Sequence, residues 1–249
     1  MIRINCDIGE REKDNPTDLA LMKHIHIANI ACGGHAGNEE TVNVFKEIAE
    51  KHRVKLSAHL SYPDKEHFGR VSMDMPLTDL LESLDIQLAL MPAADMVKFH
   101  GALYHDACNN PRLAEGLALW LSKKNIRTLI TPNGSEIHKA AEKKGLEVLR
   151  EAFAERRYQY EPDRKKLGLM DRRHDGASME DADEALRQCL TLIRYGFVEA
   201  FVENPGGPWT KSRLSMACDT LCLHSDSVIA LALAPRLYQT IMNETTVYV

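Results

Sequence analysis

Residues 29–37 read Asn-Ile-Ala-Cys-Gly-Gly-His-Ala-Gly, a short apolar run that breaks into glycines and then presents a histidine. An apolar run of this kind can form a buried strand, and the glycines permit a tight turn or a close approach to a ligand. The acidic pair Glu39 and Glu40 then precedes apolar residues at helical spacing up to position 49, which predicts a helix. The stretch therefore predicts a strand, a glycine loop and a helix, with His35 at the carboxyl end of the strand.

The simpler interpretation of this stretch is that the glycines only form a turn and that His35 is a solvated loop residue. We favour the functional interpretation because the arrangement recurs along the chain. Residues 54–59 form a predicted strand that ends in His59, and the predicted strand at 96–99 is followed directly by His100. Solvated loop histidines would not be expected to follow three predicted strands in the same way.

Alternating and apolar patterns extend this unit over the whole chain. The predicted strands lie at residues 2–8, 29–32, 54–59, 96–99, 127–130, 146–149, 198–202 and 220–224. The predicted helices lie at residues 39–49, 78–90, 113–121, 137–141, 181–195 and 228–241, with a short one near 19–22. Residues 159–175 are charged and lack apolar periodicity, which predicts a long loop, either a functional lid or a solvated excursion. A second loop is predicted at residues 204–208.

Alternating strands and helices are typical of a parallel sheet with helical crossovers, the α/β class. Seven or eight such units in 249 residues favour a single barrel domain over residues 1–249 rather than an open sheet. In such barrels the chemistry lies in loops at the carboxyl ends of the strands. The residues expected to converge on this mouth are Asp7, His35, His59, His100, Glu151 and Asp226.

Composition excludes several classes of protein. The chain has 31 basic and 36 acidic residues and a net charge of -5, so it offers no general attraction to nucleic acid. No signal peptide or membrane-spanning segment is predicted, and the six cysteines lie mostly in apolar runs, where free thiols behave as small hydrophobes. We therefore expect a reduced, cytoplasmic protein without nucleic-acid or membrane partners, and homo-oligomer formation stays open.

Six motifs in order resemble the LamB/YcsF family over nearly the whole chain. They are N-C-D-I-G-E, N-I-A-C-G-G-H-A-G, A-H-L-S-Y-P-D with F-G-R, K-F-H-G-A-L-Y, E-A-F-A-E-R-R-Y and C-L-H-S-D. The resemblance implies a distorted (β/α)7 barrel similar to the glycoside hydrolase/deacetylase fold. It also implies the role of the A subunit in an ATP-dependent 5-oxoprolinase, which opens the lactam of 5-oxoproline to L-glutamate together with the B and C subunits.

The chain departs from the family pattern at several positions. Arg11-Glu12-Lys13 stands where the family usually has Gly-Phe-Gly, Asn38 replaces an aspartate, and Ser225 replaces a glycine. The family also tends to have proline at position 60 and aspartate at position 155. These changes do not affect the expected fold, but they bear on the identity of the substrate, and a divergent paralogue is the alternative.

An ATP-dependent opening of a lactam requires cations for phosphates, an acid or base for water and donors for the developing oxyanion. The implied cofactors are ATP and Mg²⁺, although the chain has no G-x-x-x-x-G-K-[ST] loop, so another element or a partner would hold the nucleotide. Each cation among the candidates has an equally simple interpretation as an ion pair that fixes a loop. The catalytic candidates are Asp7, Lys98, His100, Glu151 and Asp226. The candidates for binding substrate are His35, His59, Asp64, Arg70, Tyr104, Arg156 and His224.

A second hypothesis is a metal-dependent amide or ester hydrolase. A carboxylate with two or three imidazoles is a reasonable shell for a divalent transition metal, here Asp7, His35 and His59, with His100 nearby. No compact H-x-x-x-H motif supports it, and histidines at barrel mouths often bind substrate directly. A third hypothesis is a binding subunit without catalytic activity, whose partner performs the chemistry.

Overall fold

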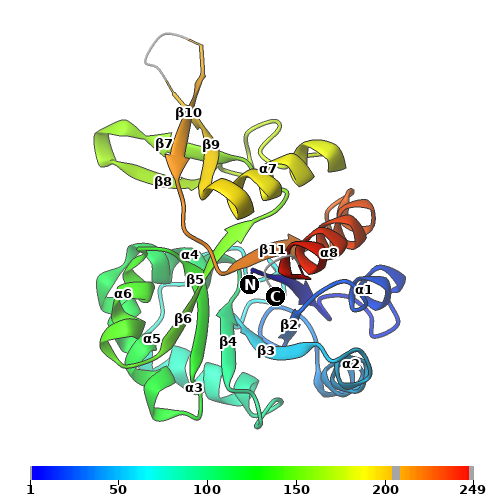
Figure 1. Ribbon diagram of the computed structural model, residues 1–249. Helices are drawn as coiled ribbons and strands as arrows, with labels where there is room; N and C mark the ends of the chain where they lie inside the picture. Colours follow the sequence, from blue (N-terminus) through cyan, green and yellow to red (C-terminus); the bar gives the residue numbers. More distant parts are fainter. Residues whose placement is uncertain (1, 204–207, 247–249) are drawn as a thin grey trace.

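The computed structural model describes residues 2–203 and 208–246. Seven parallel strands form a closed barrel, and helices surround it (Figure 1). In order around the barrel the strands are β1 (Arg3–Ile8), β11 (Thr220–His224), β6 (Glu147–Phe153), β5 (Thr128–Pro132), β4 (Met96–Phe99), β3 (Lys55–Leu60) and β2 (Ile27–Ala31). The expected (β/α)7 barrel is therefore confirmed, including its α/β class.

The helices follow the strands in the expected alternation. They are α1 (Pro16–Leu21), α2 (Glu39–His52), α3 (Leu77–Leu88), α4 (Gly101–Asn109), α5 (Pro111–Lys123), α6 (Glu136–Lys143), α7 (Ala182–Tyr195) and α8 (Ala230–Thr246). Helix α2 begins at the predicted position because the Asn38 side chain accepts a hydrogen bond from the backbone N–H of Thr41. Helix α4 was not predicted, because it follows β4 after a single residue, His100, and leaves no loop to mark its start.

A second sheet lies beside the barrel and is inserted between β6 and β11 (Figure 1). Its strands, in order, are β10 (Thr210–Ser215), β9 (Phe197–Val202), β7 (Tyr158–Glu161) and β8 (Lys166–Leu169). The predicted strand at 198–202 is thus a real strand, but it belongs to this sheet and not to the barrel. The strand β10 was not predicted, because its sequence is mostly polar and exposed.

Residues 159–175 do not form the long loop that the sequence predicted. Most of this segment is an antiparallel hairpin of β7 and β8, joined by a 3-10 turn at Pro162–Arg164. Each strand has only four residues, and β7 completes its hydrogen bonds with β9, where Tyr158 pairs with Ala200. The stabilising partner is distant in sequence, so local periodicity gives little signal. The loop predicted at 204–208 lies mainly outside the described residues.

Side chains of each barrel strand alternate between two environments. On β1, the apolar residues Ile4, Cys6 and Ile8 belong to the large hydrophobic cluster shared with the helices. The intervening Asn5 and Asp7 are also buried but bind polar side chains of other strands. A separate apolar cluster consists only of strand residues, Ile27, Met96, Ile130 and Leu149. The barrel therefore encloses polar groups as well as apolar ones.

Five of the six cysteines pack with the hydrophobic core, as their sequence context predicted, whereas the Cys222 sulfur lies 3.1 Å from the Lys98 ammonium group. All six cysteines are free thiols, and most of them are buried. Within residues 2–203 and 208–246, no helix is both long and apolar enough to cross a lipid bilayer.

Candidate functional site

A glycine places an acidic side chain over the mouth of the barrel. Gly9 follows β1 directly and adopts a φ of 74°, a left-handed conformation that favours glycine. Its N–H donates to the carboxylate of Asp18, a buried residue of α1, at 3.0 Å. The chain turns at this point, and the side chain of Glu10 then reaches the histidines at the ends of the neighbouring strands.

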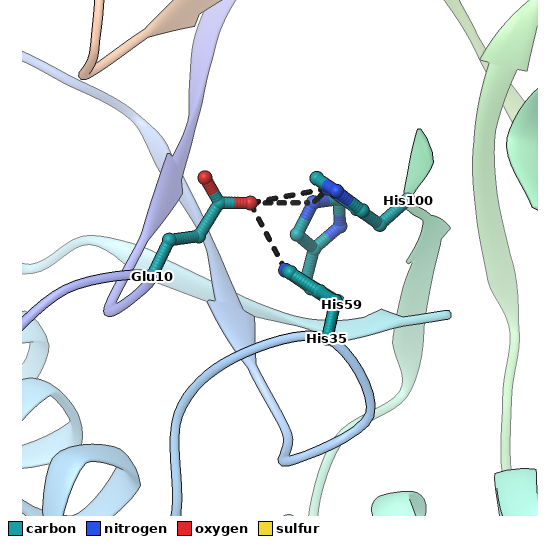
Figure 2. A group of neighbouring side chains, drawn as sticks. All are labelled: Glu10, His35, His59 and His100. Carbon is teal, nitrogen blue, oxygen red and sulfur yellow. Dashed lines mark hydrogen bonds and ion pairs between the residues drawn. The ribbon is translucent and has the colours of Figure 1, made fainter. Parts of the chain in front are cut away.

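Three histidines from three successive strand ends surround this carboxylate (Figure 2). The Oε1 atom of Glu10 lies 3.0 Å from Nε2 of His35, 3.1 Å from Nδ1 of His100 and 3.5 Å from Nε2 of His59. The Nε2 atom of His59 also lies 3.0 Å from Nδ1 of His100. We call these four residues the histidine cluster. The sequence predicted that the three histidines converge, and the structure brings them together.

Backbone carbonyl groups orient two of the rings. The Nδ1 atom of His59 lies 3.2 Å from the carbonyl oxygen of Lys98, and Nε2 of His100 lies 3.1 Å from that of Phe68. A carbonyl oxygen only accepts hydrogen bonds, so each of these ring nitrogens must carry the proton. The other nitrogen of each ring then faces Glu10. The ring of His35 stacks on that of His100 with a centroid distance of 3.7 Å.

The protonation of the cluster follows from burial and from the nearby carboxylates. Burial opposes the charge of His59, but Asp7 and Glu10 raise its pKa to about 9. Burial lowers the pKa of His35 to about 4, and it also lowers the pKa of His100. The cluster therefore holds one positive imidazolium and two neutral imidazoles at neutral pH.

A second group of charged residues lies deeper in the barrel. The ammonium group of Lys98 is 2.9 Å from Oδ1 of Asp7 and 2.9 Å from Oε1 of Glu151, and the Tyr104 hydroxyl donates to Oε2 of Glu151 at 2.6 Å. We call these four residues the lysine cluster. Burial disfavours the ammonium ion, but the two carboxylates raise the pKa of Lys98 well above its usual value. Lys98 is therefore a fixed positive charge between two carboxylates.

The two clusters meet at Asp7. Its Oδ1 atom accepts hydrogen bonds from Lys98 and from the Asn29 amide, whereas its Oδ2 atom lies 3.4 Å from Nε2 of His59. Despite burial, the positive charges of His59 and Lys98 hold the pKa of Asp7 well below its usual value. The carboxylate is thus ionised and directs one oxygen at the histidines.

A glycine after β4 sets the position of His100. Gly101 has a φ of 54°, and a methyl group there would lie 2.4 Å from the carbonyl oxygen of Gly69. We expect Gly101→Ala to lower the free energy of unfolding by about 2–5 kcal/mol, the sum of backbone strain and overpacking. Gly145 is a matched control, because its φ is 78° and no atom lies within 4 Å of the added methyl group.

Gly145→Ala should cost only the backbone strain, about 1–2 kcal/mol. Chemical denaturation of both variants measures the difference. Equal losses at Gly101 and Gly145 would show that the close approach of Gly101 to Gly69 adds no cost beyond backbone strain.

The remaining residues predicted to bind substrate lie around these clusters and not within them. His224, at the end of β11, bonds through its Nδ1 atom to the buried carboxylate of Glu155. Arg156 is buried and donates to the carbonyl oxygens of Met170 and Ala177, so it anchors the segment after β8. Burial lowers the pKa of Arg156 to about 10. These contacts hold the loops of the second sheet against the barrel.

The predicted residues on the loop after β3 have local partners. Asp64 accepts hydrogen bonds from the backbone and the ring of His67, and so fixes the turn. Arg70 and Asp226 form an ion pair at 3.4 Å, and both side chains are about half exposed, 49% and 46%. Their proposed catalytic or binding roles stay predictions, and their described partners lie outside the histidine cluster.

A hollow of about 600 Å³ opens beside the histidine cluster. Its lining includes Glu10 and His35 of the cluster together with Lys13, Lys65 and Phe68. A small molecule in this hollow would therefore meet the cluster from the solvent side. A second hollow of about 640 Å³ lies on the other sheet, between α7 and β9, and its described lining contains no residue of either cluster.

Two carboxylates of the site were not among the residues predicted from the sequence. Glu10 ends the first motif, and Glu155 lies in the fifth, so both belong to stretches that already attracted attention. Glu10 lies beyond the strand, and the left-handed turn at Gly9 returns it to the mouth. It contacts all three histidines, whereas the sequence predicted Asp7 as their carboxylate partner. Glu155 was noted only as a departure from the family pattern, because its partner His224 is 69 residues away in sequence.

The protein is a closed parallel barrel whose strands carry buried histidines, carboxylates and a lysine at their carboxyl ends. Barrel enzymes have their active sites at this end of the barrel. The chain belongs to the LamB/YcsF family, whose model matches residues 2–248. A curated relative from Bacillus cereus, the A subunit of 5-oxoprolinase, is 30% identical over 96% of this chain and 94% of its own length.

A solved structure is similar over nearly the whole chain. The lactam utilization protein from Thermus thermophilus has a TM-score of 0.80 and 27% sequence identity to this chain. The match covers 98% of this chain and 97% of the other. The second sheet is therefore included in the similarity, and not only the barrel.

Proposed function

We propose that this chain is the A subunit of a 5-oxoprolinase and that its barrel mouth binds 5-oxoproline and opens the lactam to L-glutamate. The observation that carries the proposal is the 30% identity to a 5-oxoprolinase A subunit over 96% of the chain. The similarity to a lactam utilization protein supports the same class of substrate. The two buried clusters supply the ionised carboxylates and the fixed positive charge that such chemistry requires.

Lactam hydrolysis adds water to the carbonyl carbon and breaks the C–N bond of the ring. A base must take a proton from the water, donors must stabilise the oxyanion, and an acid must protonate the departing amine. We assign the base to Asp7, because Oδ1 is held by Lys98 and Asn29 while Oδ2 faces the histidines. Lys98 and Tyr104 keep Asp7 and Glu151 in place.

The three cations that the sequence suggested for phosphate binding, Lys98, Arg156 and Arg70, are not available to a nucleoside triphosphate. Lys98 is 3% exposed and is already neutralised by two carboxylates. Arg156 is bound to backbone carbonyls, and Arg70 is paired with Asp226. We therefore derive no step of this site through ATP or Mg²⁺, and we assign the nucleotide to the partner B and C subunits.

The proposal predicts which subunits and cofactors the reaction mixture must contain for glutamate to be released. With 5-oxoproline as substrate, the complete complex with ATP and Mg²⁺ should release glutamate, whereas this chain alone, or the complex without ATP, should not. The measurement is an enzymatic or chromatographic assay of glutamate, with unfolding curves to show that each preparation is folded.

Three outcomes would contradict the proposal. If no combination of folded subunits releases glutamate, the substrate is different, as expected for a divergent paralogue. If release from an amide or ester needs no ATP and stops with a chelator, the metal-dependent hydrolase is the better hypothesis. Binding of 5-oxoproline without turnover in any mixture would favour the subunit without catalytic activity.

A further inference from the structure

We propose that the histidine cluster, Glu10, His35, His59 and His100, is a binding site for one divalent transition-metal ion of the zinc type. One carboxylate oxygen and one nitrogen from each ring lie within 4.8 Å of one another. Imidazole nitrogens with a carboxylate oxygen are a donor set that suits zinc, iron, nickel or copper better than calcium or magnesium. The inference goes beyond the proposed lactam opening and does not depend on it.

The spacing of the donor atoms fits an ion of this size. Zinc binds nitrogen and carboxylate oxygen at about 2.0–2.2 Å in tetrahedral sites, which places neighbouring donors about 3.3–3.5 Å apart. The distances from Oε1 of Glu10 to the three ring nitrogens are 3.0, 3.1 and 3.5 Å. The nitrogens of His59 and His100 are 3.0 Å apart. These four distances need to change by only a few tenths of an ångström. The stacked rings of His35 and His100, whose planes differ by 2°, must also turn toward each other for both nitrogens to face one ion.

The orientation of two rings is the one that metal ligands usually have. A metal-binding histidine commonly donates its other ring N–H to a carbonyl or carboxylate, which fixes the tautomer. His59 does so to the carbonyl of Lys98, and His100 to the carbonyl of Phe68. The remaining nitrogen of each ring consequently faces Glu10 (Figure 2). A site built only to bind substrate through N–H groups would not need this arrangement.

The charges around the cluster also favour a cation. Among the described residues, the carboxylates of Asp7, Glu10 and Glu151 outnumber the one buried ammonium group, that of Lys98, which contacts Asp7 and Glu151. Buried charges are costly unless they are paired. A divalent ion at the cluster would compensate the negative charge of these carboxylates.

The position of the cluster gives an ion access from solvent. Glu10 and His35 line the hollow of about 600 Å³, so an ion can reach the donors without passing through the barrel. The other potential donor group, Asp7, Cys222 and His224, is less suitable. The ammonium group of Lys98 lies 3.1 Å from the Cys222 sulfur and would repel a cation there.

The first test is direct binding of metal ions to the purified full-length chain. Chelator-treated protein is titrated with Zn²⁺ in competition with a chromophoric chelator, and with Co²⁺ followed by its visible absorption. We expect one ion per chain and the intense Co²⁺ bands of a site with few ligands and mostly nitrogen donors. The inference is wrong if the wild-type protein gives only the weak Co²⁺ spectrum of the hydrated ion, or if it does not compete with the chelator for Zn²⁺.

Variants locate the site. Glu10→Gln and His100→Ala should each weaken Zn²⁺ binding by about 100-fold or more, because each removes a ligand. His138→Asn is the matched control, since His138 is another buried histidine beside a carboxylate, that of Glu142. It should bind Zn²⁺ as the wild type does. Equal binding by wild type, Glu10→Gln and His100→Ala, all folded by circular dichroism, would place the ion elsewhere and refute the assignment.

Discussion

Replacement of Lys98 by methionine is expected to lower the free energy of unfolding by about 3–5 kcal/mol, because it removes the cation that lies between two buried carboxylates. The side chain of Lys98 is 3% exposed, and that of Glu151 is fully buried. Methionine has a similar length, so the main change is the loss of charge and not of volume. Denaturant unfolding of the purified variant measures the effect.

A surface lysine provides the control for this prediction. Lys139 also forms an ion pair, with Glu136 at 2.7 Å, but its side chain is 55% exposed. Solvent screens such a pair, so Lys139→Met should cost less than about 1 kcal/mol. Similar losses for the two lysines would mean that the Lys98 ion pairs do not depend on burial, and the account of the lysine cluster would be wrong.

A double variant separates the charge from the packing. If Lys98→Met is destabilising because Glu151 and Asp7 are left unpaired, Glu151→Gln in the same chain should recover at least about 1 kcal/mol of the loss. On the wild-type background the same Glu151→Gln change should be destabilising. If Glu151→Gln restores no stability, the unpaired charge of Glu151 is not the cause of the loss.

The barrel and most of its polar mouth could be predicted from the sequence because of the geometry of parallel strands. In a parallel barrel every strand ends on the same side, so a histidine after each of three strands must converge with the others. His35, His59 and His100 could therefore be placed without a structure. Lys98 was recognised for its charge, but not as an inward-facing residue with Asp7 and Glu151 on either side.

What could not be predicted depends on turns and on distant partners. The contribution of Glu10 requires the left-handed backbone of Gly9, which sequence patterns alone do not indicate. The second sheet depends on pairing between β7 and β9, about 40 residues apart, as at Tyr158 and Ala200. Short polar strands of this kind acquire their stability from the sheet and leave no clear periodicity in the sequence.

Two departures from the family pattern form one contact. The Nη2 atom of Arg11 donates to the backbone oxygen and the hydroxyl of Ser225, both at 2.9 Å, and pairs with Asp18 at 3.2 Å. The loops after β1 and β11 are thus tied together close to Glu10. Glycine at both positions could not make this contact. The two substitutions are best understood as one structural change at the rim of the site.

Replacement of Asp7 by asparagine is expected to lower kcat for lactam opening by about 10²–10⁴ in the assembled complex, the usual contribution of a general base. Asparagine keeps the shape of the side chain, and Lys98 retains Glu151 as a partner at 2.9 Å, so the chain should stay folded. Steady-state rates of glutamate release, with unfolding curves of the isolated chain, measure the two effects separately.

Asp226 is the carboxylate against which this assignment can be tested. The sequence placed both residues at the mouth, but Asp226 is 46% exposed and pairs with the half-exposed Arg70, whereas Asp7 lies between Lys98 and His59. The half-exposed carboxylate of Asp226 lacks a fixed orientation toward the histidines. Asp226→Asn should therefore reduce kcat much less than Asp7→Asn does. A larger loss from Asp226→Asn would move the base to the exposed rim, and the buried Asp7 would then serve only to balance the charge of Lys98.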